Sequence, residues 1–138
     1  MGLKLLLARD GNILCEVSLS PSDWPREELE EELNVFRGGM ERLFRMYSAL
    51  LNENRIRMLR TLVEDEDSML SFKEFIDMLK MNPKIVREHA MRLREAGFLD
   101  SPSRGKYHLS QAGRLLFMAA GPALLKVFDV LREEFEQE

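Results

Sequence analysis

Residues 71–109 read SFKEFIDMLKMNPKIVREHAMRLREAGFLDSPSRGKYHL. This stretch decides the fold, because it contains a helix start, a tight turn, a second helix start and a hairpin, in that order. Ser71, with Glu74 three residues later, forms a capping box in which each side chain bonds the other residue's backbone N–H. The sequence therefore predicts a short helix, whose apolar side is formed by Phe75, Ile76 and Leu79.

The second helix of this stretch is expected to begin at Asn82 and to end before Gly97. Lys80-Met81 form the turn that precedes it. Asn is a favoured cap residue, and Pro83 fits the first helical position, where no backbone N–H is needed. Gly97 is the glycine expected just past a helix end.

Two neighbouring features complete the pattern. Upstream, the sequence predicts a helix from Asn52 or Glu53 to the acidic run at residues 64–67. Downstream, Phe98-Leu99-Asp100 and residues 106–109 flank a turn, which predicts a hairpin. Helix, short helix, tight turn, helix and hairpin is the order of a winged helix-turn-helix. The predicted fold class is therefore mainly α (α+β), with this domain at residues 52–116.

The same stretch carries residues that resemble a known family. They are Leu79-Lys80-Met81-Asn82, Val86, His89, Leu93 and Ala96-Gly97-Phe98-Leu99. They are similar, without gaps, to the helix-turn-helix of the arsenic-repressor-like (ArsR) family and of related MarR-type repressors. At the corresponding positions the ArsR-like family has Leu-Gly-Leu-Ser, Val, His, Leu and Ala-Gly-Leu-Val. The resemblance implies a prokaryotic or archaeal transcriptional regulator that binds DNA.

The resemblance continues through the hairpin and covers residues 52–116. Residues 104–109, RGKYHL, are similar to the wing of the ArsR-like family with one residue missing, and residues 110–116, SQAGRLL, to the start of the next helix in MarR-type repressors. Three features depart from the family. Lys80 replaces a glycine, so the turn is expected to be longer or differently shaped. Ile85 and Arg87 replace the Ser/Thr phosphate contacts, and the cysteine metal motif is absent, which argues against a metal sensor.

The charge distribution points to the same segment. Residues 82–108 contain six basic and three acidic residues, a net charge of +3, whereas the whole chain carries −4, so the other 111 residues carry −7. Positive charge concentrated on one helix and the adjoining hairpin is typical of phosphate binding.

The spacing of Val86, Ala90 and Leu93 predicts the buried face of the second helix, so the opposite face is free to enter a major groove. Arg87 has the chemistry to bond guanine and Glu88 to accept from cytosine. The helix start at Asn82 leaves backbone N–H groups for a phosphate. The predicted DNA-binding residues are Asn82, Lys84, Arg87, Glu88, Met91, Arg92, Arg104 and Lys106.

Residues 1–51 are predicted to form a hairpin followed by a long helix. Apolar residues alternate on both sides of Asp10-Gly11, which is a strong hairpin signal. The helix then repeats apolar residues at spacings of three and four, namely Leu29, Leu33, Phe36, Met40, Leu43 and Tyr47. This heptad stripe indicates either a dimer interface or packing within its own chain, and the sequence favours neither. Gly38-Gly39 predicts a kink or short break.

Residues 117–138 are predicted to form a final helix that also contributes to dimerisation, through Leu124, Phe128 and Leu131. Ser110 caps the helical region that leads into it. Gly121-Pro122 is expected to kink or split that region, because proline removes a backbone hydrogen bond.

Several classes of protein are disfavoured. No apolar run approaches the roughly 18 residues needed to span a bilayer, and no signal sequence is recognised, so a cytoplasmic protein is expected. Cys15 is the only cysteine and only two histidines are present, so neither a disulfide nor a metal site is expected, and no cofactor is predicted. The sequence contains no nucleophile, phosphate-loop or metal-ligand motif of the kind that enzymes carry, so an enzyme is not expected.

The sequence thus favours a homodimeric transcriptional regulator that binds double-stranded DNA, without a membrane partner. The helix at residues 82–96 would lie in the major groove and the hairpin at 98–109 on the adjacent groove or backbone. The alternative is a winged-helix module for protein–protein interaction, since one fold serves many functions. The operator and any small-molecule effector are not specified by the sequence.

Overall fold

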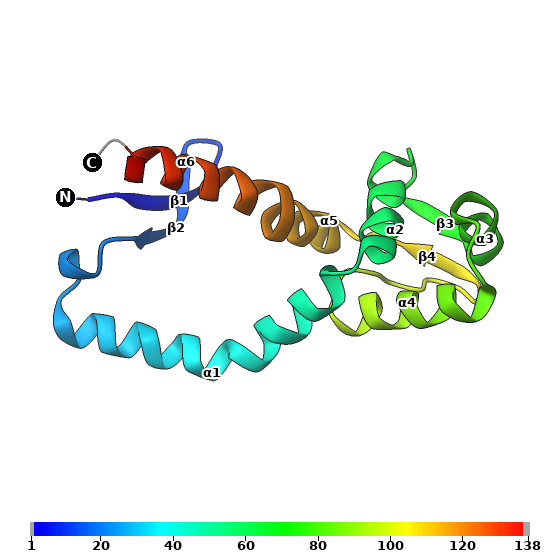
Figure 1. The fold of residues 1–138 in the computed structure, drawn as a ribbon, viewed down its shortest axis with the longest axis horizontal. Helices are drawn as coiled ribbons and strands as arrows, with labels where there is room; N and C mark the ends of the chain where they lie inside the picture. Colours follow the sequence, from blue (N-terminus) through cyan, green and yellow to red (C-terminus); the bar gives the residue numbers. More distant parts are fainter. Residues whose placement is uncertain (1, 137–138) are drawn as a thin grey trace. The chain divides into compact units, whose positions relative to one another are not determined.

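The computed structural model describes residues 2–136, and α-helices make up most of it (Figure 1). Two separate pairs of antiparallel strands complete the secondary structure of these residues. The mainly α fold class predicted from the sequence is confirmed. The chain divides into two compact units, Met1–Arg42 and Leu43–Glu138, which meet within one helix. The functional division at residues 51 and 116 stays a prediction.

The first unit begins with the predicted hairpin. Strand β1 (Lys4–Arg9) pairs with β2 (Asn12–Ser18), and the register shifts between Leu7 and Ala8. Asp10 and Gly11 have φ angles of 50° and 82°, which are the left-handed conformations that a two-residue hairpin turn requires. A short 3-10 helix, η1 (Pro21–Asp23), follows. The indole of Trp24 then donates a 3.0 Å hydrogen bond to the carbonyl of Ser18.

Helix α1 (Arg26–Leu50) contains the heptad stripe and runs without interruption through Gly38 and Gly39. Of the two outcomes predicted at these glycines, a kink or a short break, the short break is therefore wrong. Each glycine costs about 1 kcal/mol in a helix interior. A 25-residue helix tolerates that cost because its backbone hydrogen bonds continue on both sides.

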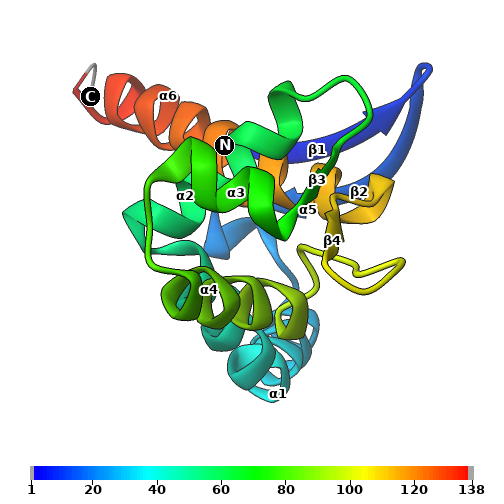
Figure 2. The ribbon, with the colours of Figure 1, turned by 90° about the vertical axis from the view of Figure 1, so that its right-hand side faces the viewer.

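The second unit contains the winged helix-turn-helix, and its helices begin where the sequence places the caps. Helix α2 (Glu53–Glu64) starts after Asn52, whose side chain accepts hydrogen bonds from two backbone N–H groups. Helix α3 (Phe72–Leu79) starts after Ser71, and the capping box with Glu74 is complete. Helix α4 (Pro83–Glu95) is followed by Gly97, which has a φ of 92°. Figure 2 shows these helices around the short β3–β4 pair.

The hydrophobic core joins α2, α3 and α4 to the strands and loops around them. Its largest fully buried side chains are Met58, Leu59, Leu62, Phe75, Val86, Leu93, Phe98 and Leu109. Burial of each such side chain contributes about 1.5–3 kcal/mol. The core therefore holds α4 in place against both α2 and α3.

The wing differs from the simple hairpin predicted. Strand β4 (Lys106–His108) pairs with β3 (Met69–Ser71), a strand that the sequence analysis missed. The predicted hairpin partner contributes only one bridge, in which Asp100 and His108 exchange backbone hydrogen bonds of 2.8 and 2.9 Å. A three-residue strand is too short to show a period of two, so the sequence pattern could not reveal β3.

The chain ends in a helical region that changes type midway. Ser110 caps α5 (Gln111–Met118), a π-helical segment η2 (Ala119–Ala123) follows, and α6 (Leu124–Glu136) completes the region. The segment η2 contains Gly121 and Pro122, so the α-helical pattern changes there to a π-helix, while the helical region as a whole is not split. No helix within residues 2–136 is long and apolar enough to cross a membrane.

Candidate nucleic-acid interface

The turn before α4 is compact and contains a lysine in a conformation that glycine adopts most readily. Lys80 has φ 55° and ψ 40°, and its backbone N–H donates to the carbonyl of Ile76. This left-handed conformation costs a residue with a side chain about 1–2 kcal/mol. The backbone at Lys80 is thus one that glycine would adopt at lower cost.

The start of α4 is closed by its own cap. The Asn82 side chain accepts a 2.8 Å hydrogen bond from the backbone N–H of Lys84, and Pro83 has no N–H to offer. The cap therefore leaves fewer free donors at this helix start than an uncapped helix would. A phosphate here would bond to the N–H of Ile85 or displace the Asn82 side chain.

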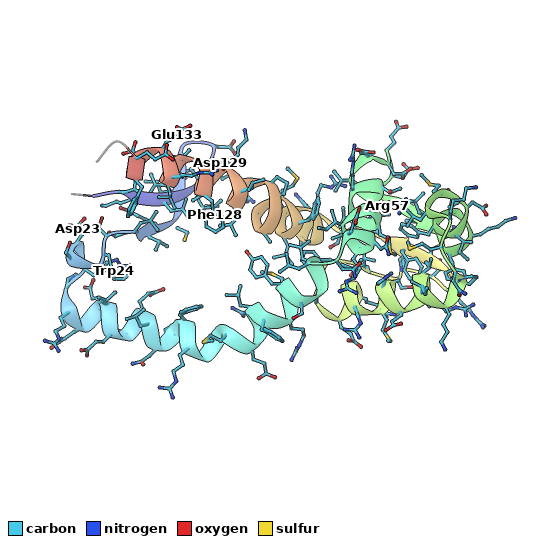
Figure 3. The ribbon with its side chains drawn as sticks, in the orientation of Figure 1. Asp23, Trp24, Arg57, Phe128, Asp129 and Glu133 are labelled. Atoms are coloured by element: carbon cyan, nitrogen blue, oxygen red, sulfur yellow. The ribbon has the colours of Figure 1, made fainter. Side chains whose placement is uncertain are left out.

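Helix α4 has a buried face and an exposed face, as its apolar spacing predicts. Val86, Ala90 and Leu93 are fully buried. The predicted DNA-binding residues of this helix all lie on exposed positions, namely Lys84, Arg87, Glu88, Met91 and Arg92. Figure 3 shows charged side chains projecting from α4 on the side away from α2. This surface is available for contact with a large partner.

Charges on the exposed face of α4 are partly paired. Glu88 and Arg92 lie one turn apart, with 3.6 Å between Glu88 Oε1 and Arg92 Nη2. Both are well exposed, so their ion pair contributes little to stability and opens readily. Arg92 is thus less free to meet a phosphate than Lys84, which has no carboxylate within ion-pair distance among residues 2–136.

The guanidinium of Arg87 lies over an aromatic ring. Its Cζ atom lies 4.7 Å from the centroid of the Phe72 ring, at the start of α3. None of the carboxylates in the described part of the chain forms an ion pair with Arg87. The sequence analysis assigned a role to Arg87 but not to Phe72, because spacing within α4 says nothing about contacts with α3.

The wing tip presents two cations beside α3. Arg104 and Lys106 are exposed and flank Gly105, whose φ is 78°. The Ser101 hydroxyl lies 3.2 Å from the carbonyl oxygen of Ser103 and 3.1 Å from that of Lys106, and its one proton is shared between these two acceptors, which restrains the loop. The Gly105 carbonyl accepts a 2.7 Å hydrogen bond from the backbone N–H of Phe72. The tip is therefore tied to the helix-turn-helix rather than free.

A buried arginine lies behind α4. Arg55 of α2 is only 8% exposed and donates to the carbonyls of Ala49 and Ser48 at the end of α1, the latter over 3.0 Å. Its Nη1 lies 3.1 Å from Nδ1 of His89. A guanidinium only donates, so His89 accepts at Nδ1 and is neutral, with its proton on Nε2. Arg55 therefore links the end of α1 to α4.

The environment of this link shifts two pKa values. Burial, followed by the charges of Arg55 and Arg92, lowers the pKa of His89, and Glu88 opposes the effect. Burial and Arg92 also lower the pKa of Arg55. The sequence analysis did not assign a role to Arg55. A signal was present, because Arg55 shares one helix face with the buried residues Met58, Leu59 and Leu62.

The residues predicted to form a dimer interface lie on α1 and α6. Leu33, Phe36 and Met40 of α1 are each more than half exposed, at 55%, 53% and 53%. Leu43 and Phe128 are also exposed, whereas Leu29, Tyr47, Leu124 and Leu131 are half-buried. Phe128 is labelled in Figure 3. Much of the predicted stripe is thus open to solvent in the single chain.

Residues 2–136 contain no group of three His, Cys, Asp or Glu residues arranged to hold a metal ion. Cys15 is exposed on β2, and it forms no disulfide.

Comparisons with known proteins give likenesses in fold only. The sequence matches no protein-family model and no curated protein. The structure is similar to that of a MarR family transcriptional regulator from Streptomyces coelicolor, with 16% identity and a TM-score of 0.46, over 80% of this chain and 94% of that one. HlyU from Vibrio cholerae has 19% identity and a TM-score of 0.49, over 62% of this chain and 94% of its own. The winged helix is therefore identified from the order of helices and strands in this chain, and not from these likenesses.

Proposed function

We propose that this protein binds double-stranded DNA as a sequence-specific transcriptional regulator. Helix α4, with its flanking residues at 82–96, would enter the major groove, and the wing at 98–109 would contact the adjacent groove or the backbone. The observation that carries the proposal is a group of exposed cations on α4 and the wing, of which four, Lys84, Arg87, Arg104 and Lys106, are assigned contacts with DNA. None of the four has a carboxylate partner among residues 2–136.

These cations lie in a segment, residues 82–108, that carries a net charge of +3 in a chain whose net charge is −4. Positive charge concentrated on one helix and its adjoining wing is typical of a surface that binds a polyanion. Phosphates would supply the missing negative charge and release bound counterions as they did so. An interaction module has no need of such a surface.

The four cations have different roles in this proposal. Lys84, Arg104 and Lys106 would contact phosphates, which positions the protein without reading sequence. Arg87 would bond to a base edge, because a guanidinium matches the paired acceptors of guanine. Glu88 would read cytosine once its ion pair with Arg92 opens. Phosphate contacts and base contacts can be distinguished by experiment, because only the loss of a base contact depends on the DNA sequence.

We also propose that the protein is a two-fold dimer through the exposed apolar stripes of α1 and α6. A symmetric dimer would bury these residues and place two α4 helices on one face of the duplex. Half-sites would then lie about 34–36 Å apart, which is one turn of DNA.

The test is selection of a bound duplex from a random pool, followed by titrations at several salt concentrations. The logarithm of the binding constant should fall linearly with the logarithm of salt concentration, by about 0.9 per phosphate contacted. The variant Lys84→Ala should reduce this slope. Lys126→Ala is the matched control, because Lys126 is an exposed cation on α6 and should leave the slope unchanged.

Absence of any duplex binding tighter than about 1 mM at low salt would contradict the proposal, since nonspecific binding alone normally exceeds this. The interaction module would then take its place. If Lys126→Ala and Lys84→Ala reduced the salt slope equally, DNA would bind elsewhere on the protein than proposed.

A further inference from the structure

Phe72, the first residue of α3, contacts both parts of the proposed interface. Its ring lies under the guanidinium of Arg87, with 4.7 Å from Arg87 Cζ to the ring centroid. Its backbone N–H donates a 2.7 Å hydrogen bond to the carbonyl of Gly105 at the wing tip. One residue thus fixes a side chain of α4 through its ring and the wing through its backbone.

The stack restrains Arg87 without using its hydrogen-bond donors. A guanidinium is planar, and its five N–H groups point outward in that plane. The Phe72 ring has no nitrogen or oxygen acceptor, so this contact leaves the N–H groups of Arg87 without a conventional hydrogen-bond partner and available to a base edge. Because Arg87 forms no ion pair among the described residues, the Phe72 ring is the charged group's principal protein contact.

We infer that Phe72 is a positioning residue for sequence readout, which acts by holding the Arg87 guanidinium in place. This rests on the proposed function. An arginine side chain normally loses rotational freedom when it binds, and a side chain already stacked loses less. The chemistry favoured is a pair of acceptors in one plane, such as O6 and N7 of guanine.

Side-chain substitutions separate the ring from the backbone bond. Phe72→Leu removes the aromatic face but keeps the N–H that bonds Gly105, so the wing tip keeps its anchor. Phe72→Tyr keeps the ring. Neither substitution changes the protein's charge, so contacts with phosphates remain the same.

The experiment is a double-mutant cycle of Phe72→Leu and Arg87→Ala, measured on the selected duplex and on a duplex of unrelated sequence. Phe72→Leu should weaken binding to the selected duplex about three- to tenfold, the effect of losing a cation–π contact and its restraint. It should leave binding to the unrelated duplex and the salt slope unchanged. In the Arg87→Ala background it should cause no further loss. Phe72→Tyr should bind within about twofold of wild type, since its ring still faces the cation.

An equal loss in both backgrounds would show a general structural role and overturn the inference. So would an unaltered affinity of Phe72→Leu for the selected duplex. If wild type binds no duplex at all, the proposed function fails first and the inference falls with it. If wild type binds and the cycle shows no coupling, the inference alone fails.

A measurement without DNA covers the case in which Phe72→Leu does not fold. In wild type, the ring should shift the NMR signals of the Arg87 Hδ protons upfield, because Cδ is two bonds from Cζ, which lies over the ring at 4.7 Å from its centroid. Phe72→Tyr should retain that shift. Random-coil shifts for these protons in folded wild type would overturn the inference.

Discussion

His89 accepts a hydrogen bond from the buried Arg55, so its charge state bears on stability. Protonation would place a second positive charge against the guanidinium and remove the acceptor at Nδ1. Burial and Arg55 lower the pKa of His89 in the folded chain. Unfolding frees the histidine to return to a pKa of about 6.5.

The free energy of unfolding should therefore fall as the pH decreases below about 6.5, because the unfolded chain binds a proton that the folded chain does not. Above that pH the His89 contribution is fully present. His89→Gln keeps an acceptor that does not titrate, so this variant should show a weaker pH dependence. Urea unfolding at pH 7.5 and 5.5, followed by circular dichroism, measures the difference. Parallel pH profiles for the two proteins would contradict the expectation.

Arg87 and Arg104 should differ in how they affect DNA binding. Arg87→Ala should cost about 1–3 kcal/mol on the best site and relax base preference there, because the contact is to a base edge. Arg104→Ala should weaken all sequences similarly and reduce the salt slope by about one unit. Anisotropy titrations on matched and mismatched duplexes compare the two. Identical behaviour would remove the distinction between base and phosphate contacts.

At the scale of elements, helix starts were predictable and long-range contacts were not. Asn52, Ser71, Asn82 and Ser110 each cap the helix that follows, because capping depends on residues within three positions. Strand β3 depends instead on pairing with β4, across more than 30 residues of sequence. No local pattern records such a contact.

In the candidate interface, too, some features could be predicted from the sequence and others could not. The exposed face of α4 follows from a helical period applied to three apolar residues, Val86, Ala90 and Leu93. The contacts of Arg55 with His89 and of Phe72 with Arg87 join different helices. They depend on how α2, α3 and α4 pack, which the sequence pattern does not specify.

The packing of α5 against the wing leaves no room for a side chain at Gly113. A Cβ atom there would overlap the backbone carbonyl of Phe98 and lie 3.3 Å from the Leu109 side chain. Gly113→Ala should lower the free energy of unfolding by about 1–3 kcal/mol. Gly38→Ala is the matched control, because a Cβ at Gly38 meets nothing within 4 Å. It should raise the free energy of unfolding by up to about 1 kcal/mol, since alanine favours a helix. Equal effects of the two variants would contradict the packing argument.

For the whole molecule, the exposed stripe of α1 sets the expected oligomeric state. Light scattering should give twice the chain mass of 16.1 kDa at micromolar concentration. Phe36→Glu places a charge in the stripe and should produce the monomer, because an unpaired charge is costly to bury. Arg37→Glu lies next to the stripe and serves as the control, with the dimer retained. A wild-type monomer that persists at higher concentration would exclude this interface.

The Arg55 link also bears on how the second unit opens and closes over time. The guanidinium of this α2 residue bonds the last turn of α1 and the middle of α4, so α2 separates from neither of these helices without breaking a hydrogen bond of Arg55. Such segments tend to open as one cooperative unit. The slowest amide hydrogens of α2 and α4 should then exchange with solvent at the same free energy of opening. In Arg55→Met, the amide hydrogens at the end of α1 should exchange at a lower free energy of opening. Different free energies of opening for α2 and α4 in wild type would contradict this coupling. The buried cation would thus make α4, the helix proposed to bind DNA, one of the last parts of the protein to open.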